Sequence, residues 1–412
     1  MRLNRARQLV TSLSVVIAAT LIGAQVFSAS CGTAASLFPQ NPPLPGQAAV
    51  AGFGDPLPGH TPAQLELFLE GRDDFLEVET ADEGLGPIFN GLSCAQCHSV
   101  PTVGGGGFIN EVRAGRLLSD GRFEELPGGS LMSLFSIPPH LAQEAIPAGA
   151  NVVAFRRSLP LFGAGLIEAI PDHAIISLTM VPKPPGVAGR HHLVTDVITG
   201  QPRVGRFGWK AQHATLRAFA GDAYRNEMGI TNEVFPEESA PNGNREVLAL
   251  VDRVPDPEDL PDPATGRSGV DKFANFMRFL APPPRGDITE SVKRGEEVFN
   301  RIGCASCHAV LTTGPSDDPL FDRKPVPLFS DLLLHDIGTG DGIAQDDARP
   351  NEIRTPPLWG LRVRSPLLHD GRAAGIEDAV QLHGGEAGAV RSEFVSLAPA
   401  DRQALLDFLK SL

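Results

Sequence analysis

The chain has 412 residues, of which 42% are hydrophobic and 20% charged, and its formal net charge at pH 7 is −14. This length predicts two to three domains with buried cores, and the acidic balance argues against nucleic acid or an anionic membrane surface as a partner. Glycine contributes 44 residues and proline 37, which is below the level of a disordered low-complexity chain and indicates a folded protein with many loops.

Residues 1–30 have the pattern of a signal peptide. Three arginines, Arg2, Arg5 and Arg7, precede an apolar run from Leu9 to Phe27, and small residues follow it. An uncleaved membrane anchor is the alternative, because the run is near the lower length limit for spanning a bilayer. The pattern predicts export, and for a bacterial chain a periplasmic location.

Cys31 follows Phe-Ser-Ala-Ser, which is similar to the lipobox of bacterial lipoproteins, although Ser28 stands where leucine is more usual. Lipidation of Cys31 and simple cleavage near Ser30 or Ala35 are both open. A lipid at Cys31 would be the protein's contact with a membrane. The following residues, 31–62, are dense in proline and glycine and are interpreted as a tether or a wrapping arm.

A helical pattern begins at Ala63 and leads to the first of two C-x-x-C-H motifs, Cys94-Ala-Gln-Cys97-His98. Residues three and four apart lie on the same face of a helical turn. The two cysteines can therefore form thioethers to one edge of a porphyrin, while the histidine turns its imidazole onto the iron.

The second motif is Cys304-Ala-Ser-Cys307-His308, and both motifs carry a phenylalanine five residues before the first cysteine. Together they use every cysteine except Cys31, so none remains for a disulfide framework. A zinc site or a redox dithiol is the competing interpretation of a single such motif. Two copies behind an export signal favour two covalently bound haem c groups.

Between the motifs, the segment 155–173 is apolar apart from Arg156, Arg157 and one carboxylate, Glu168, before Pro171. Glu168 has two interpretations: a carboxylate at a helix end that pairs with an arginine, or an acid–base group that faces a haem. Further on, residues 182–206 are expected to form a loop and a hairpin. A helix within 206–229 is expected to stop at Gly229.

Two proline-rich breaks, at 254–266 and 281–286, divide the remaining chain, and the second predicts a boundary between domains 63–285 and 286–412. After it, Asp287-Ile-Thr-Glu290 has the spacing of a capping box and predicts a helix that ends in the second motif. Gly295 on this helix would allow close packing of another helix, for which the last helix, 399–412, is the candidate. A first helix crossed by a last helix is how small cytochrome c domains enclose haem.

The second axial position of each iron decides its function. No methionine occurs after His308, so the C-terminal haem needs another ligand from its own domain. The candidates are His335, His369 and His383, each beside a glycine-containing turn.

These residues resemble the bacterial di-haem c-type oxidoreductases, the so-called thiol oxidoreductase branch, which is related to di-haem cytochrome c peroxidases and to MauG. The resemblance covers about residues 63–412 and is carried by GLGPIFNGLSCAQCH, LFGAGLIEAIPD, RFGWKA, GEEVFNRIGCASCH, SDLLLHDIG, EIRTPPLWGL and LLHDGRA with LHGGEA. It implies a mainly α fold of two cytochrome c-like domains with long Pro/Gly-rich loops.

The resemblance also implies roles for single residues. His98 and His308 would be the proximal ligands, and His383 stands where the relatives carry the distal Met or Tyr of the C-terminal haem. His335 and His369 would then support these ligands. Glu168 would be the carboxylate at the reactive N-terminal haem, where it would move a proton to and from bound peroxide.

Other side chains could cap the N-terminal iron instead: His140, His173, His191, His192, His213, Met132, Met180, Met228 and Met277. The relatives hold a calcium ion between their haems, but its full ligand set is not found in this sequence. Trp209 and Trp359 are inter-haem aromatics or, alternatively, buried core residues.

The expected function is that of a periplasmic di-haem oxidoreductase. Its C-terminal haem would relay electrons to or from a small redox protein, and its N-terminal haem would reduce a small oxidant such as peroxide. Two alternatives remain open: a non-catalytic electron-transfer cytochrome, and a MauG-like oxidation of a partner protein.

Overall fold

The structure is a computed structural model that describes residues 51–412. The signal peptide, Cys31 and most of the expected tether lie outside the described residues. Within residues 51–412, none of the helices combines the length and the apolar character that crossing a bilayer requires.

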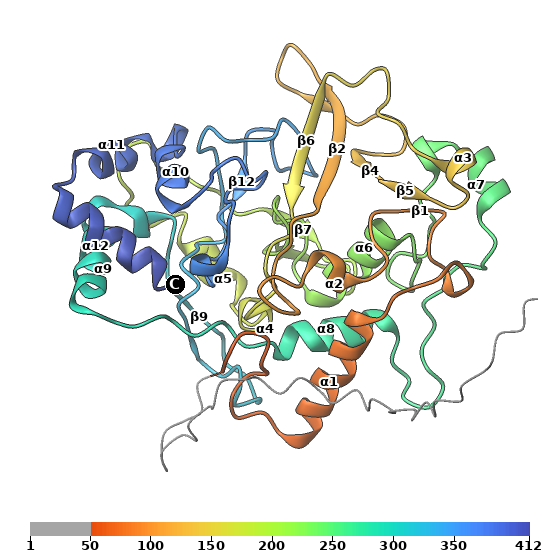
Figure 1. The fold of residues 1–412 in the computed structure, drawn as a ribbon, viewed down its shortest axis with the longest axis horizontal. Coiled ribbons are helices and arrows are strands. Elements are labelled where there is room, and N and C mark those ends of the chain that lie inside the picture. Colours follow the sequence, from red (N-terminus) through yellow and green to blue (C-terminus); the bar gives the residue numbers. More distant parts are fainter. Residues whose placement is uncertain (1–50) are drawn as a thin grey trace, which may run out of the picture. The chain divides into compact units, whose positions relative to one another are not determined.

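Helices make up most of the regular structure (Figure 1). Their bounds are α1 (Pro62–Leu76), α2 (Cys94–Cys97), α3 (Pro139–Ala142), α4 (Ala164–Glu168), α5 (Asp172–Ser177), α6 (Leu216–Met228), α7 (Arg245–Val251), α8 (Gly269–Phe279), α9 (Glu290–Ile302), α10 (Ile376–Gln381), α11 (Gly388–Ser396) and α12 (Pro399–Lys410). The expected helices appear as α1, α6, α9 and α12, and α6 ends at Gly229 in the left-handed conformation, as its sequence predicts.

The strands are short and form small antiparallel sheets. Their bounds are β1 (Ile88–Phe89), β2 (Asn110–Leu117), β3 (Phe123–Glu124), β4 (Leu131–Met132), β5 (Phe135–Ser136), β6 (Val152–Arg157), β7 (Leu193–Thr195), β8 (Pro202–Val204), β9 (Leu311–Thr312), β10 (Pro325–Val326), β11 (Leu334–His335) and β12 (Ile353–Arg354). The hairpin expected within 182–206 is confirmed as β7 and β8.

The longest pairing joins β2 to β6, from Asn110 opposite Arg157 to Gly115 opposite Val152. One end of this ribbon projects beyond the helices, and the other end lies among them (Figure 1). Its strands bring polar side chains to one of the two haem cavities described below. The expectation for 155–173 did not include β6. The apolar run in this segment is compatible with either a short strand or a helix, and periodicity alone does not distinguish the two.

One helix pair consists of α9 and α12, as the sequence predicts. A Cβ atom added at Gly295 would lie 1.9 Å from the carbonyl oxygen of Ala404, so the two backbones approach as closely as glycine permits. The cap differs from the expected one. Thr289, not Asp287, is the N-cap residue of α9, and its side chain accepts a hydrogen bond from the backbone N–H of Val292 at 3.2 Å.

A second helix pair, α1 and α8, repeats this arrangement. A Cβ added at Gly71 would lie 2.1 Å from the carbonyl oxygen of Lys272. Thr61 and Gln64 form a capping box at the start of α1. Helix α8 was not expected, because proline-rich segments flank it on both sides.

Two hydrophobic cores accompany the two helix pairs. The larger contains α1, α4, α6 and α8, and the smaller contains α9 and α12. The larger core also takes in apolar residues from 311–333, beyond the expected boundary at residues 285/286. The two cores are therefore not divided cleanly along the chain.

Candidate functional site

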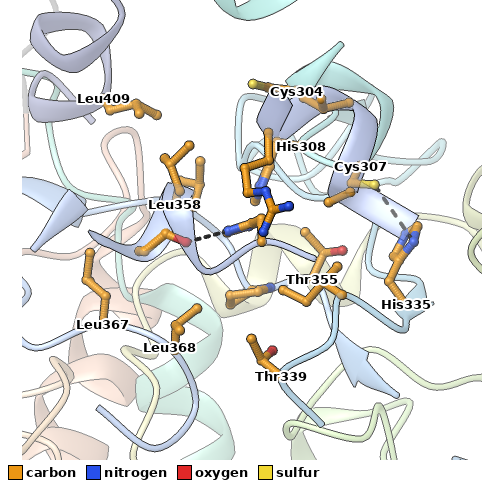
Figure 2. Close-up of a pocket in the computed structure, with 18 of the residues that line it drawn as sticks. Cys304, Cys307, His308, His335, Thr339, Thr355, Leu358, Leu367, Leu368 and Leu409 are labelled. Atoms are coloured by element: carbon orange, nitrogen blue, oxygen red, sulfur yellow. Dashed lines mark hydrogen bonds between the residues drawn. The ribbon is translucent and has the colours of Figure 1, made fainter. Parts of the chain in front are cut away.

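The second C-x-x-C-H motif opens into a deep cavity, called here the C-terminal cavity. Cys304, Cys307 and His308 line it, together with largely apolar side chains from α9 to α12, and it encloses about 1370 Å³ of empty space. Figure 2 shows His308 reaching into the cavity from the turn that carries the two cysteines.

His308 and His383 face each other in this cavity. Their ring centres lie 6.4 Å apart. Metal–imidazole nitrogen bonds are about 2.0 Å long and each nitrogen lies about 1.1 Å from its ring centre, so an ion held between two imidazoles separates the centres by roughly 6.2 Å. The observed separation therefore fits one iron with both rings as axial ligands.

The ring orientations support the same fit. The Nδ1 of His308 lies 2.9 Å from the carbonyl oxygen of Phe329, and the Nδ1 of His383 lies 2.6 Å from that of Ala379. A proton on each Nδ1 leaves each Nε2 free to bind a metal. Burial and the neighbouring His383 lower the pKa of His308 to about 4, and burial also lowers the pKa of His383. Both rings are therefore neutral at pH 7, as metal ligation requires.

Two guanidinium groups in the same cavity, one of a buried and one of a half-buried arginine, lack a carboxylate partner among the described residues. Arg354 donates to the carbonyl oxygens of Gly208 and Thr355, and Arg364 donates to that of Pro357. Burial lowers the pKa of each guanidinium to about 10. Unpaired buried cations are costly, so they indicate an anionic group in the cavity, and haem propionates have that charge.

His335 lies beside the motif and has a different role from His383. Its Nε2 is 2.9 Å from Asp331 and its Nδ1 is 2.8 Å from Glu386. The same Nδ1 is 3.8 Å from the sulfur of Cys307, a contact drawn in Figure 2. Hydrogen bonds to the two carboxylates raise the pKa of His335 to about 12 despite its burial. A ring held by two carboxylates is not free to bind iron. A fourth histidine, His369, also lines this cavity.

The first C-x-x-C-H motif lines a second cavity, the N-terminal cavity, which encloses about 1630 Å³ of empty space. The Nδ1 of His98 lies 3.0 Å from the carbonyl oxygen of Gly105, so its Nε2 is also available to a metal. Burial lowers the pKa of His98. The residues around each motif thus fit a covalently attached haem.

The N-terminal cavity differs from the C-terminal one in its polar lining. It contains no second histidine among its described lining residues, but it contains Glu111, Glu227 and Gln212. Glu111 pairs with Arg113, and Glu227 accepts a hydrogen bond from Asn90 at 2.9 Å. Burial and the negative charge of Glu111 raise the pKa of Glu227 to about 7.

Glu168 does not line the N-terminal cavity. One of its oxygens accepts a hydrogen bond from the backbone N–H of Leu216, the first residue of α6, at 2.7 Å. The other accepts from Nε of Arg278 at 3.1 Å. These contacts match the first interpretation of this residue, a carboxylate that pairs with an arginine at a helix end.

Among the candidates for capping the N-terminal iron, the structure brings two into the cavity, Met228 and Met277. The others do not line it: His140, His173, His191, His192, His213, Met132 and Met180. His213 instead lies 2.9 Å from a carboxylate oxygen of Asp222.

The sequence did not single out Glu111 or Glu227, because Glu111 lies on a strand, β2, that was not expected, and Glu227 lies on α6, far from either motif along the chain. Glu227 lies in the last turn of α6, which is a common surface position, and only the folded chain places it in the N-terminal cavity.

Trp209 and Arg354 line both cavities. The indole Nε1 of Trp209 donates a hydrogen bond of 2.7 Å to the carbonyl oxygen of Arg157, and its ring meets His369 edge-on at 6.1 Å. Trp359, the other tryptophan, lines neither cavity and packs on Gly163. The inter-haem interpretation therefore fits the position of Trp209, and the core interpretation fits that of Trp359.

Comparison with known proteins gives a consistent set of relatives. Residues 144–412 match the family described as "Di-haem oxidoreductase, putative peroxidase". Cytochrome c peroxidase Ccp of Escherichia coli K12 is 26% identical over 190 residues, which cover 42% of this chain and 38% of that protein. Methylamine utilization protein MauG of Methylophilus methylotrophus is 28% identical over 157 residues, which cover 35% of this chain and 43% of that protein.

The matched segments thus span less than half the length of these curated relatives. Among solved structures, the diheme peroxidase BthA of Burkholderia thailandensis aligns over 84% of this chain and 86% of its own, with 15% identity and a TM-score of 0.38.

Proposed function

Because this chain belongs to the di-haem oxidoreductase family, we propose that it is an exported, periplasmic enzyme that reduces a small oxidant such as peroxide at the haem on His98. The haem on His308 would exchange electrons with a small redox protein. One observation carries this proposal: the C-terminal cavity offers two facing imidazoles, whereas the N-terminal cavity offers one imidazole together with acid and amide groups.

The repeated helix pairs support two cytochrome c-like halves. In each pair a glycine lies at the crossing, and a phenylalanine four residues later packs near the proximal histidine. Phe75 lies 6.1 Å from His98, and Phe299 lies 6.2 Å from His308, between ring centres. Each motif histidine is therefore backed by the same arrangement, a close helix pair with a phenylalanine near the imidazole ring.

His308 and His383 would hold the iron between two neutral imidazoles, and a haem held in this way would relay electrons without offering a place for a substrate. Nitrogen ligation in place of the usual methionine sulfur should also lower the reduction potential. We therefore assign His308 and His383 to the relay centre.

Haem supplies the redox chemistry of such a site, and the surrounding chain must supply protons and orientation. Reduction of one peroxide to two waters consumes two electrons and two protons. Glu227 can accept and return a proton near neutral pH, since its pKa is raised to about 7. Arg113 holds Glu111 in place beside it. We propose Glu227, rather than Glu168, as the proton-transfer group.

Spectroscopy of the purified protein tests this division of roles. We expect two haems per chain, one low-spin ferric haem and one with a high-spin component that cyanide or peroxide alters. Two unreactive low-spin haems in every redox state would instead indicate the non-catalytic electron-transfer cytochrome.

A further inference from the structure

A group of carboxylates lies outside both haem cavities, in the loops that follow α6 and α7. Glu238, Asp256 and Glu258 each place an oxygen within 4.8 Å of the others, and we call these three residues the carboxylate cluster. None of them lines either haem cavity. Asp256 is exposed to solvent, so an ion can reach the cluster from outside.

Glu238 gives the cluster an unsatisfied buried oxygen. The residue is only 8% exposed. Its Oε1 accepts a hydrogen bond of 2.7 Å from the backbone N–H of Ser239, but its Oε2 is buried and has no hydrogen-bond partner. A buried carboxylate oxygen without a donor costs free energy, so this oxygen requires a positively charged or protonated neighbour.

The chain itself does not supply that positive charge. Among the ion pairs of residues 51–412, none includes a member of the cluster, and the charges that act most strongly on Glu238 are those of other carboxylates. Asp252 adds a further negative charge close by. Burial, followed by the charges of Glu258 and Asp256, raises the pKa of Glu238 to about 9.

The cluster is nevertheless held in position by its surroundings. Thr231 donates through its backbone N–H to Glu258 at 2.7 Å and through its hydroxyl to Asp256 at 2.9 Å. Gly84 makes room for Glu258, because a Cβ there would lie 2.6 Å from the Glu258 side chain. These contacts keep the carboxylates of the cluster close together, although their like charges would otherwise move apart into solvent.

We propose that the carboxylate cluster binds one calcium ion. Calcium takes oxygen ligands at about 2.3–2.6 Å, so ligand oxygens on opposite sides of the ion lie up to about 5 Å apart, in accord with the spacing of the cluster. An all-oxygen set of carboxylates excludes the softer metals, which prefer nitrogen and sulfur. Water at the exposed side of Asp256 completes the coordination.

The ion would fasten the loop behind α6 to the loop behind α7. Helix α6 carries Tyr224, Glu227 and Met228, all of which line the N-terminal cavity. Calcium at the cluster would therefore stabilise the wall of that cavity from outside without touching it.

Calcium titration of the holoprotein tests this site. The protein is treated with a chelator, dialysed and titrated with calcium chloride by calorimetry. We expect the double variant Glu238→Gln/Asp256→Asn to bind one calcium ion fewer per chain than the wild type. The control is Glu66→Gln/Glu125→Gln, which removes two charges from exposed carboxylates outside any cluster and should bind as the wild type does. Equal stoichiometry in the double variant, or no calcium binding by the wild type, overturns the proposal.

Haem content and circular dichroism check that the double variant folds. If it does not, Asp256→Asn alone serves, because Asp256 is exposed. In Asp256→Asn we expect the calcium affinity of one site to fall at least about tenfold, which is the usual effect of substitutions at metal sites. An unchanged affinity overturns the proposal. Calcium should also raise the unfolding temperature of the wild type and of the control more than that of the cluster variant. Magnesium at equal concentration should not displace calcium, and equal competition would refute the assignment to calcium.

Discussion

At the residue scale, His383 is the side chain on which the assignment of the relay centre depends. Its ring faces that of His308, and both hold their Nδ1 against backbone carbonyls. The change His383→Ala should convert the C-terminal haem from low-spin to high-spin, because one axial position becomes vacant. Electronic absorption and electron paramagnetic resonance measure this conversion.

The matched control for this variant is His369→Ala, since His369 lines the same cavity. We expect the control to keep the low-spin spectrum. A C-terminal haem that stays low-spin with an unchanged potential in His383→Ala, or that becomes high-spin in His369→Ala, contradicts the assignment.

Glu227 determines the expected pH dependence. Its pKa is raised to about 7 because burial and Glu111 disfavour the charged form, so the carboxylate that can accept a proton becomes populated as the pH rises through about 7. Peroxide turnover, measured as kcat/KM, should rise over the same interval. In Glu227→Gln this rise should disappear, and kcat/KM should fall by roughly 10²–10⁴, the usual contribution of a general acid or base.

Glu168→Gln is the comparison variant for the pH profile, because Glu168 bonds to the start of α6 and to Arg278 outside the cavity. It should lose stability but keep the rise near pH 7. Loss of that rise in Glu168→Gln, with the profile of Glu227→Gln unchanged, would restore the original expectation for Glu168.

How far single residues can be predicted depends on how local their chemistry is. The haem-binding cysteines and histidines follow from spacing within five residues. The missing methionine leaves three candidate histidines for the second ligand, and only the family resemblance selects His383 among them. Glu227 could not be found in this way. Its perturbed pKa arises from burial and from Glu111 on a distant strand, neither of which leaves a mark in the adjacent sequence.

At the element scale, the two helix pairs show a repeat that the sequence interpretation had placed differently. From the sequence, Phe89 is expected to be the counterpart of Phe299, because each lies five residues before the first cysteine of a motif. The structural counterpart of Phe299 is Phe75: Phe299 packs on Phe408 at 5.1 Å, and Phe75 packs on Phe276 at 4.9 Å. In the N-terminal half, β1 and its flanking turns separate the helix from the motif, so distance along the chain misleads.

The crossing of α9 and α12 predicts a large effect of a single methyl group. Gly295→Ala would place its Cβ within 1.9 Å of the carbonyl oxygen of Ala404, so the helices must separate. We expect the free energy of unfolding to fall by about 1–3 kcal/mol, the usual cost of overpacking, or by more. Chemical denaturation followed by circular dichroism measures it.

Gly388→Ala is the control for this prediction. Gly388 has helical backbone angles, with φ −59° and ψ −38°, and nothing lies within 4 Å of an added Cβ. Alanine there should leave stability unchanged or raise it by about 0.4–1 kcal/mol. Equal effects of the two substitutions would show that the crossing does not require glycine.

The elements that the sequence predicted are those with strong periodicity and clear ends. Helix α9 has an apolar stripe and a glycine stop, and α12 begins with proline. The β2–β6 ribbon and α8 were missed for opposite reasons. The ribbon depends on pairing between strands that are far apart in the chain, which no local pattern indicates. Helix α8 was not recognised because proline-rich segments lie on both sides of it.

At the scale of the whole molecule, the two cavities share a wall formed by Trp209 and Arg354. A relay centre and a reactive centre are useful together only if electrons pass between them. The backbone N–H of Arg354 donates to the carbonyl oxygen of Trp209 at 2.8 Å, so the two residues form one connected bridge. The resemblance suggested an aromatic residue between the haems, but only the packed chain distinguishes Trp209 from Trp359.

Trp209→Phe should slow the exchange of electrons between the two centres while leaving each centre intact. Phenylalanine keeps an aromatic ring but loses the indole N–H that bonds to Arg157, so the bridge becomes smaller and less firmly held. We expect kcat for peroxide reduction to fall with KM for peroxide unchanged, because the substrate pocket is preserved. Trp359→Phe, which alters a buried tryptophan outside both cavities, should leave kcat at the wild-type value once folding is verified. A wild-type kcat in Trp209→Phe would mean that electron transfer does not depend on this bridge. An equal fall in both variants would contradict the prediction as well, because a general loss of packing would then account for it.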